Sequence, residues 1–160
     1  MKRKNSQLAL LEGWSDPVAF AHQGLAVQTW LMQRLILRSI RDNERTAVGA
    51  CHSIGKTFIT AVAILWFLFM HRGAIVLITA PTWRQVEKVI WPEFKSLYAR
   101  FAKVLEGFGV PSGATLQKKP YCELGDKWFA LGFSSTEPEN AQGFHAPYML
   151  LVVEEASGGN

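Results

Sequence analysis

The hydrophobic and polar positions along this chain follow two spacings, which predict strands alternating with helices. Residues 74–80, "AIVLITA", are apolar on both faces and rich in branched side chains, as in a central parallel strand. Residues 58–70 form a longer apolar run that indicates a buried helix, and "YMLLVV" at 148–153 indicates a second buried strand. This order predicts an α/β fold with a mainly parallel sheet flanked by helices on both faces.

Two further segments place apolar residues at helical spacing. In residues 25–41 the apolar positions are Leu31, Leu35 and Ile36, and the helix is expected to end at Asp42-Asn43. In residues 83–105 one face carries Val86, Ile90, Phe94, Leu97, Phe101 and Val104. Pro92 lies inside this second pattern, so we expect it to kink or divide the helix.

The rest of the chain is predicted from shorter signals. Residues 46–50 are a short strand candidate, while residues 114–123 and 127–133 read as two strands joined at residues 124–126 in a hairpin-like way. Pro120 fits an edge strand best. Residues 1–24 are expected to be an irregular lead-in with a turn at Ser15-Asp16-Pro17, followed by one domain over residues 25–160.

Composition adds only mild constraints. The chain has 160 residues, of which 49% are hydrophobic and 19% charged, so it can bury the core of one globular domain. A net charge of +4 leans weakly toward a polyanionic partner and equally fits an ordinary solvated surface. Cys51 and Cys122 lie far apart without metal-ligand spacing, which suits a reducing compartment.

No segment has the pattern of a membrane span or a secretion signal. The apolar run at 58–70 is too short to cross a bilayer, and the basic start of the chain leads only to a brief apolar patch at residues 8–11. We therefore expect the protein to stay in the cytoplasm in which it is made.

The stretch "GACHSIGKTF" at 49–58 is a candidate phosphate-binding loop (Walker A). The standard pattern is G-x-x-x-x-G-K-[ST], and here Ala50 stands at the first glycine position. Such a loop supplies backbone N–H groups and a helix N-terminus for phosphates, a lysine for the β and γ oxygens, and a hydroxyl for Mg²⁺. An isolated G-K-T is more often a surface turn, but the flanking strand and helix favour nucleotide binding. The predicted nucleotide-binding residues are Ala50, Cys51, His52, Ser53, Ile54, Gly55, Lys56 and Thr57.

The stretch "LLVVEEA" near the end of the chain is the candidate partner of this loop. Phosphate-loop ATPases have a strand that ends in two acids, the first holding Mg²⁺ and the second orienting the attacking water. Glu154 would be the metal-side acid, together with Thr57, and Glu155 the catalytic base. Aspartate is usual at the first position. The extra methylene of Glu154 moves the carboxylate outward, which is enough to weaken or reshape a metal site whose octahedral geometry is strict. The alternative is an exposed pair of glutamates after a buried strand.

Three ordered stretches together resemble the large subunit of phage DNA-packaging terminases. These stretches are "ACHSIGKTF", "ITAPTWRQVEKVIWPEF" and "AQGFHAPYMLLVVEEASG". The resemblance implies a P-loop NTPase fold of the RecA-like (ASCE) type and an ATPase that uses ATP and Mg²⁺ to move double-stranded DNA into a capsid. It also implies a homo-oligomeric ring, a portal protein and a small terminase subunit as partners, and the cytoplasm of a bacterial host.

The same resemblance suggests roles for a few more residues. Gln28 in "LAVQTW" would be the adenine-reading glutamine, although an exposed helical glutamine is the equally plain reading. His52 would lie near the γ-phosphate or face solvent. His145 and Arg84 fall in matching segments, and structural roles are the default for both.

Two features lead us to keep other functions open. Members of the family continue into a coupling motif and a nuclease domain, and this chain carries neither, so we expect an amino-terminal, apparently truncated part of the ATPase with an exposed apolar sheet edge and poor solubility. The alternatives are a helicase-like ATPase, for which no strand-tracking motif is visible, and a non-catalytic remnant that binds nucleotide or DNA. Glu154 lends weight to the latter.

Overall fold

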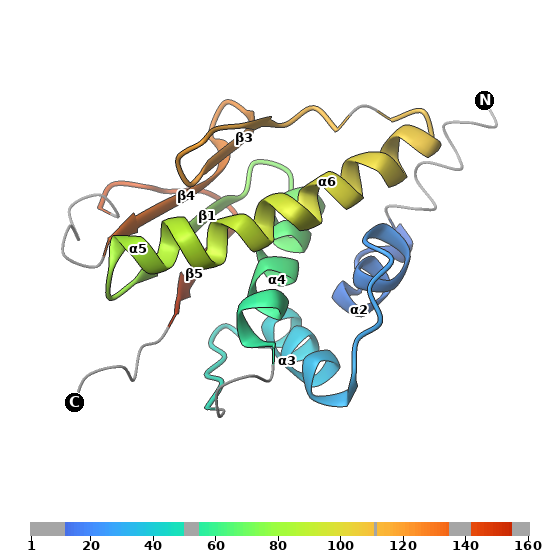
Figure 1. Ribbon diagram of the computed structural model, residues 1–160, viewed down its shortest axis with the longest axis horizontal. Helices are drawn as coiled ribbons and strands as arrows, with labels where there is room; N and C mark the ends of the chain where they lie inside the picture. Colours follow the sequence, from blue (N-terminus) through green and yellow to red (C-terminus); the bar gives the residue numbers. More distant parts are fainter. Residues whose placement is uncertain (1–11, 50–54, 111, 135–141, 155–160) are drawn as a thin grey trace.

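The computed structural model describes residues 12–49, 55–110, 112–134 and 142–154 (Figure 1). Its elements, in chain order, are the helices and strands α2 (Pro17–Ala19), η1 (Phe20–Gly24), α3 (Leu31–Asp42), α4 (Lys56–Met70), β1 (Ile75–Ala80), α5 (Trp83–Gln85), η2 (Val86–Ile90), α6 (Trp91–Gly107), β2 (Thr115–Leu116), β3 (Tyr121–Gly125), β4 (Trp128–Ser134) and β5 (Met149–Val153). The α/β class predicted from the sequence is confirmed.

The five strands of the described residues form one mixed sheet in the order β2-β3-β4-β1-β5. β1 pairs in parallel with both β4 and β5, whereas β2–β3 and β3–β4 are antiparallel. The prediction of a mainly parallel sheet is therefore too strong, because one side of β1 continues into an antiparallel meander. β1 itself is buried at every position, as its two-sided apolar sequence predicts.

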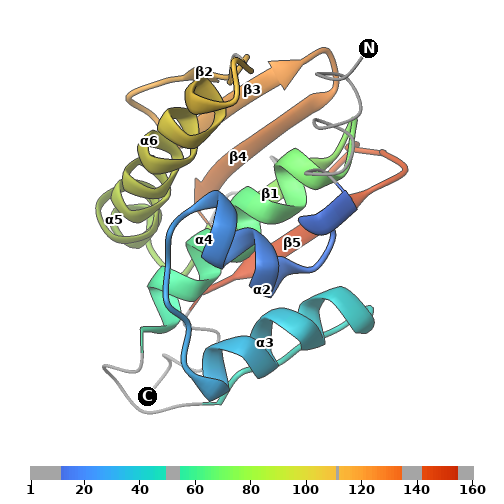
Figure 2. The same ribbon diagram turned by 90° about the vertical axis from the view of Figure 1, so that its right-hand side faces the viewer.

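Helices α4 and α6 pack on one face of the sheet. The main core joins side chains of α4 and α6 to the sheet residues Val76, Ile78 and Ala130, and Figure 2 shows α4 and α6 lying over the strands. The opposite face carries a smaller cluster around Ile75 and Leu77, in which no residue of a described helix takes part. Within the described parts of the chain, the expectation of helices on both faces is thus not met.

Helix α4 is the central helix of the fold and begins two residues earlier than its apolar run. It is apolar on nearly all sides because it packs against the sheet, α6 and the segment before α3 at once. Two indole groups tie its carboxyl half to neighbouring elements: Trp128 Nε1 donates to the Leu68 carbonyl at 2.7 Å, and Trp66 Nε1 donates to the Trp14 carbonyl at 3.1 Å. The lead-in is therefore part of the same core and includes the short helices α2 and η1.

Pro92 divides the long helix as predicted. Proline has no N–H to donate to the carbonyl four residues earlier, and the turn before it, η2, has π-helical hydrogen bonding. α6 then runs on to Gly107 and buries Phe94, Leu97 and Phe101 against α4 and the sheet.

The predicted strand at 114–123 is two strands. β2 and β3 pair with each other in antiparallel fashion, and residues 117–120 join them. The prediction missed this turn. Pro120 has no N–H to donate, so a strand ladder cannot continue through it. The hairpin between β3 and β4 is confirmed, with its turn at Asp126-Lys127.

The predicted strand at 46–50 is wrong for the residues that the structure describes. Residues 45–49 have no regular secondary structure and are mostly exposed, and Ala50 lies outside the described residues. Thr46 instead lies beside α3, where its hydroxyl is 3.0 Å from that of Ser39. A short apolar run becomes a strand only when a neighbouring strand pairs with it, and no described strand pairs with these residues.

Helix α3 is shorter than predicted and turned differently about its axis. It begins after Trp30, because residues 25–30 form no helix and the buried side chains of Leu25 and Val27 hold this segment against the core. Its inward face carries Gln33 and Leu37, while Leu31 and Leu35 are 61% and 49% exposed. The predicted apolar face was therefore wrong for these two leucines.

Strand β5 has the predicted position and a different environment. It is an edge strand in which Leu150 and Val152 pack on the main core, whereas Met149, Leu151 and Val153 are exposed. The prediction of a fully buried strand is wrong, and the expected exposed apolar edge is observed. None of the described helices has the length and apolar character that a bilayer crossing requires.

Candidate functional site

The candidate site is built around the amino-terminal end of α4. Gly55 stands directly before the helix with a φ of +74°, a left-handed conformation that glycine adopts without steric cost. Lys56 and Thr57 form the first turn and are half-buried. The backbone N–H groups of this turn have no intrahelical acceptor, and the helix dipole adds partial positive charge, so this end of α4 suits an anion.

The acidic end of β5 lies against the same turn of α4. Thr57 Oγ1 donates to Glu154 Oε1 at 3.3 Å, and Thr60 Oγ1 donates to Glu154 Oε2 at 3.3 Å. Thr57 and Glu154 are 97 residues apart in sequence. The structure thus brings together the two predicted metal-side residues, the hydroxyl of the loop and the first acid of the pair.

The position of Glu154 is fixed by the sheet. Its backbone N–H donates to the Thr79 carbonyl at 2.9 Å, which extends the β1–β5 pairing by one residue past the end of β5. Its side chain spans two threonines one turn apart on α4, with one carboxylate oxygen at each hydroxyl.

A hollow of about 500 Å³ lies on the α6 side of Thr57. Its other walls come from η2 and the start of α6 and include Lys88, Glu93 and Ser96. Lys88 comes from η2, the π-helical turn before Pro92. The end of α4 is therefore bounded by a carboxylate on one side and by an open polar hollow on the other.

Several predicted site residues lie outside the described residues. These are Ala50, Cys51, His52, Ser53 and Ile54 of the loop, and the proposed base Glu155. Their roles stay predictions.

Gln28 is described and is exposed on the irregular segment before α3. Its neighbour Thr29 is buried and fixes the segment, because the Thr29 hydroxyl lies 3.0 Å from His22 Nε2. Arg84 and His145 are both exposed, and neither takes part in the contacts around Thr57. Among the described residues, none of these three hydrogen-bonds to Thr57 or Glu154.

Gln33 is a site neighbour that the sequence reasoning missed. It is buried in the first turn of α3, and its Oε1 accepts the Trp30 N–H at 3.4 Å. Its Nε2 is so close to Gly55 that a Cβ added at Gly55 would lie 3.0 Å from it. The signal available in the sequence was a glutamine at helical spacing from Leu37, on the face that the structure buries. It was overlooked because the inward face of this helix was assigned to Leu31 and Leu35.

Groups of three or more His, Cys, Asp or Glu side chains that could hold a metal ion are absent from the described residues. The donors near the end of α4 are one carboxylate and two hydroxyls, all oxygen atoms. Such a sparse oxygen set fits Mg²⁺, which keeps several waters and takes further oxygens from substrate phosphates, and it does not fit a protein-only zinc site. Cys122 is a buried thiol, and burial raises its pKa to about 12, which keeps it protonated and unreactive.

Comparison with known proteins gives one informative match. The chain is 29% identical over 139 residues to a protein of Enterobacteria phage P7 described as "Probable terminase, large subunit". The match covers 81% of this chain and 27% of that protein, so the chain spans about a quarter of the length of its relative. No family model matches the chain, and no solved structure matches it significantly. The similarity supports a terminase relationship at this coarse level.

Proposed function

We propose that this chain is the ATP-binding and ATP-hydrolysing motor segment of a phage DNA-packaging terminase large subunit. The observation that carries the proposal is the contact of Thr57 with Glu154 at the amino-terminal end of α4. Residues from a G-K-T turn and from an acidic strand end, far apart in sequence, meet where a phosphate-loop ATPase needs them. The similarity to the phage P7 protein supports the same class.

The first turn of α4 would hold the triphosphate. Gly55 gives the backbone its left-handed turn before α4, which would let the N–H groups of this turn bind phosphate, and Lys56 would add a positive charge for the β and γ oxygens. Residues 50–54 would complete the cradle, and Gln28 would read the adenine as a donor and acceptor.

Thr57 and Glu154 would hold Mg²⁺, which would neutralise negative charge on the phosphates. In the structure these two side chains bond to each other, so each already points its oxygen at the shared space. Thr60 keeps the second carboxylate oxygen oriented. Glu155 would accept a proton from the attacking water.

The wider function follows from the class of protein. Hydrolysis would move double-stranded DNA into a capsid, in a ring of subunits that works with a portal protein and a small terminase subunit in the bacterial cytoplasm. Neighbouring subunits often supply an arginine to such sites, so hydrolysis by the isolated chain would be slow.

Calorimetric titration with a non-hydrolysable ATP analogue and Mg²⁺ tests the proposal. We expect binding by the unaltered chain, loss of binding in Lys56→Ala, and unchanged binding in Lys103→Ala, which removes an exposed lysine of α6 away from the site. Absence of binding by a folded chain, or equal binding by both variants, would count against a nucleotide site at α4.

A second candidate, a nucleotide-binding chain without turnover, is favoured by one observation. Glu154 stands where aspartate is usual, and both of its carboxylate oxygens are taken up by threonines. Glu154→Asp separates the two functions in a phosphate-release assay. The variant should hydrolyse ATP faster than the unaltered chain if the chain is a motor segment, and should remain inactive if the chain only binds nucleotide.

A further inference from the structure

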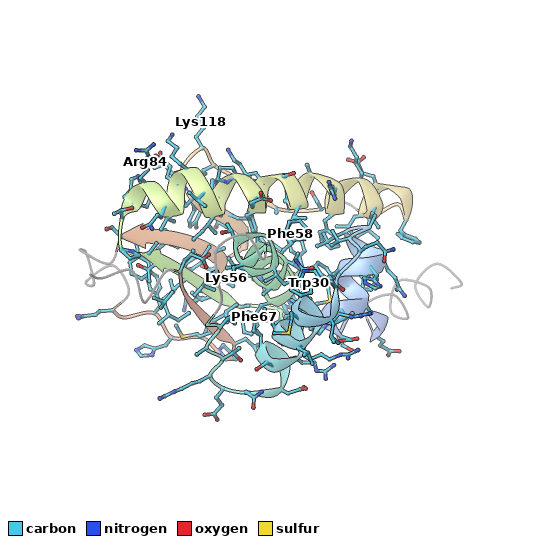
Figure 3. All side chains as sticks on the ribbon, turned by 60° about the horizontal axis from the view of Figure 1, so that its bottom comes forward. Trp30, Lys56, Phe58, Phe67, Arg84 and Lys118 are labelled. Carbon is cyan, nitrogen blue, oxygen red and sulfur yellow. The ribbon has the colours of Figure 1, made fainter. Side chains whose placement is uncertain are left out.

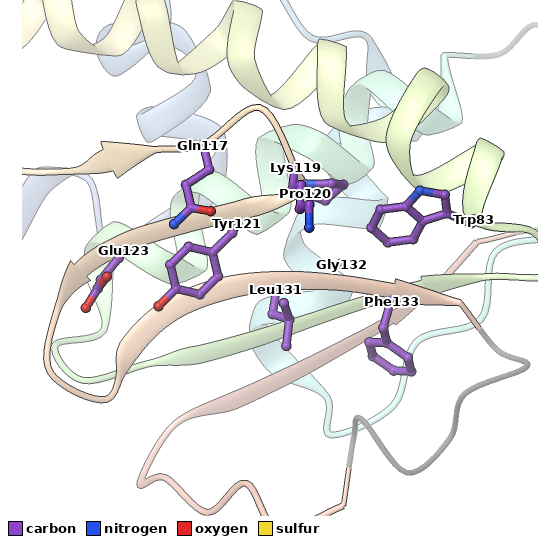
Figure 4. A pocket seen from close by; sticks show the side chains of 9 residues that line it. All are labelled: Trp83, Gln117, Lys119, Pro120, Tyr121, Glu123, Leu131, Gly132 and Phe133. Carbon is purple, nitrogen blue, oxygen red and sulfur yellow. The ribbon is translucent and has the colours of Figure 1, made fainter.

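A second hollow, of about 530 Å³, is lined by residues of β3, β4 and the segment before β3 together with Trp83, and by no residue of α4. Its lining includes Trp83, Tyr121 and Phe133 together with the polar side chains Gln117, Lys119 and Glu123 (Figure 4). None of these residues belongs to the contacts of Thr57, Thr60 and Glu154. The volume is within the range of small-molecule sites, so the hollow can admit a ring-sized group.

The hollow is held open by the way residues 117–121 are anchored. Gly132 N–H donates to the Pro120 carbonyl at 2.7 Å, and Tyr121 N–H donates to the Lys119 carbonyl at 2.6 Å. Trp91 Nε1 donates to the Gln117 carbonyl at 3.4 Å. A Cβ at Gly132 would lie 2.5 Å from Pro120 Cβ, so only glycine permits this close approach. The segment that carries Gln117 and Lys119 is thus fixed against β4 and α6.

The aromatic side chains give the hollow one kind of chemistry. Trp83 is 38% exposed, a large apolar surface to leave in water, and Figure 4 shows its ring pointing toward Lys119 and Pro120. Tyr121 is half-buried and stacks on Phe129 with ring centroids 5.8 Å apart. Burial and the charge of Glu123 raise the pKa of Tyr121, so its hydroxyl stays protonated. These side chains offer flat faces on which a planar ring can stack.

The positively and negatively charged side chains of the hollow lie in different parts of it. Trp83 and Glu123 stand at opposite ends, with Lys119 between them on the Trp83 side (Figure 4). Arg84 follows the lining residue Trp83 in sequence, and Lys118 precedes the lining residue Lys119. Both side chains extend into solvent at the same end of the molecule (Figure 3). One end of the hollow therefore suits an anion, and the other accepts hydrogen bonds through Glu123.

A nucleotide with a free base matches this arrangement. A base that stacks on Tyr121 could donate an exocyclic amino group to Glu123, while the backbone phosphate meets Lys119 and the neighbouring base of the strand stacks on Trp83. A base inside a duplex is stacked and paired and cannot enter a hollow, whereas a base of a single strand can. A peptide would offer no regular series of anionic groups to Lys119 and its neighbours Lys118 and Arg84.

We propose that this hollow binds an unpaired base of single-stranded DNA, with preference for a base that carries an amino group. The site goes beyond the proposed ATPase, because phosphate binding at α4 needs none of these residues. It gives the chain a contact for an unwound or free DNA end, separate from its contact with nucleotide at the end of α4.

Fluorescence anisotropy of a short labelled oligo(dC) strand tests the proposal on the full 160-residue chain. Trp83→Ala and Lys119→Ala remove the stacking face and the central cation, and Phe108→Ala and Lys103→Ala are matched exposed residues of the α6 region. Because stacking contributes about 1–3 kcal/mol per base, we expect Trp83→Ala to weaken binding at least about fivefold. The matched variants should bind like the unaltered chain, and circular dichroism checks that every variant is folded.

Three comparison ligands decide the identity of the bound group. A blunt duplex and oligo(dT) should bind more weakly than oligo(dC), since the first has no free base and the second has no exocyclic amine. Equal binding of the duplex, unchanged binding by Trp83→Ala, or displacement of the strand by equimolar dCMP would each overturn the proposal. Lys56→Ala should keep oligo(dC) binding, so a failure of the nucleotide site and a failure of this site remain distinguishable.

Discussion

Replacement of Gly55 by alanine tests whether the turn before α4 is a functional conformation. Gly55 has a φ of +74°, and Gly73, at the other end of α4, has a φ of +75°. A Cβ at Gly73 would meet nothing within 4 Å, whereas a Cβ at Gly55 would lie 3.0 Å from Gln33 Nε2. Gly73→Ala is therefore a matched control with the same backbone strain and no neighbour.

The size of the effect on stability follows from these conformations. Left-handed backbone costs an alanine about 1–2 kcal/mol relative to glycine. The smaller conformational freedom of alanine in the unfolded chain returns about 0.4–1 kcal/mol. Each variant should lose about 1 kcal/mol in the free energy of unfolding, and Gly55→Ala slightly more, because the Gln33 amide must move aside.

The two variants should differ sharply in nucleotide binding. Gly55→Ala would displace the N–H groups at the start of α4. We therefore expect it to weaken binding of the ATP analogue by at least about tenfold in the calorimetric titration. Gly73→Ala should bind like the unaltered chain at the same temperature. Urea unfolding supplies the stabilities of both. If Gly55→Ala bound the analogue as tightly as Gly73→Ala, the end of α4 would not be the phosphate site.

Three more predictions address the rest of the molecule. Thr60→Val should raise the Mg²⁺ concentration needed for analogue binding severalfold, because it removes one hydrogen bond that orients Glu154, and unchanged Mg²⁺ dependence would count against that role. Gly132→Ala should lose about 1–3 kcal/mol in urea unfolding, whereas Gly107→Ala, with open space around its Cβ, should lose nothing; equal stabilities would contradict the close approach at Gly132. Burial raises the pKa of Cys122 to about 12, so above about pH 9 the unfolded thiol ionises first and stability falls by up to about 1.4 kcal/mol per pH unit. Cys122→Ala should flatten this alkaline decline in urea unfolding, and an unchanged slope would show that the thiol is not the cause.

The sequence predicted best the elements whose structure depends on local pattern. The apolar run of α4, the two-sided strand β1 and the division of the long helix at Pro92 are all in the structure. Each depends on residues that are neighbours in sequence, such as the missing N–H of Pro92. The α/β class follows from their alternation.

Elements that depend on distant partners were predicted less well. The run at 46–50 has strand-like residues but no pairing strand in the described structure, and β5 is an edge strand whose exposed face a local pattern cannot reveal. The inward face of α3 was assigned to leucines because a buried glutamine is rare. Gln33 is inside because it caps Trp30 and lies against Gly55, and these contacts are tertiary.

The meeting of Thr57 and Glu154 shows how one register links the two halves of the candidate site. Local pattern places a glutamate pair after β5 but does not say which of the two faces α4. Parallel pairing of Thr79 with Val153 puts Leu150 and Val152 on the helix side of the sheet, and strand alternation puts Glu154 on that side too. A slip of one residue in the β1–β5 register would bring the next residue, Glu155, to Thr57 and would turn Leu150 and Val152 outward. Burial of these two side chains in the main core therefore selects the acid that meets the loop, so the packing of β5 and the chemistry at the end of α4 depend on the same register.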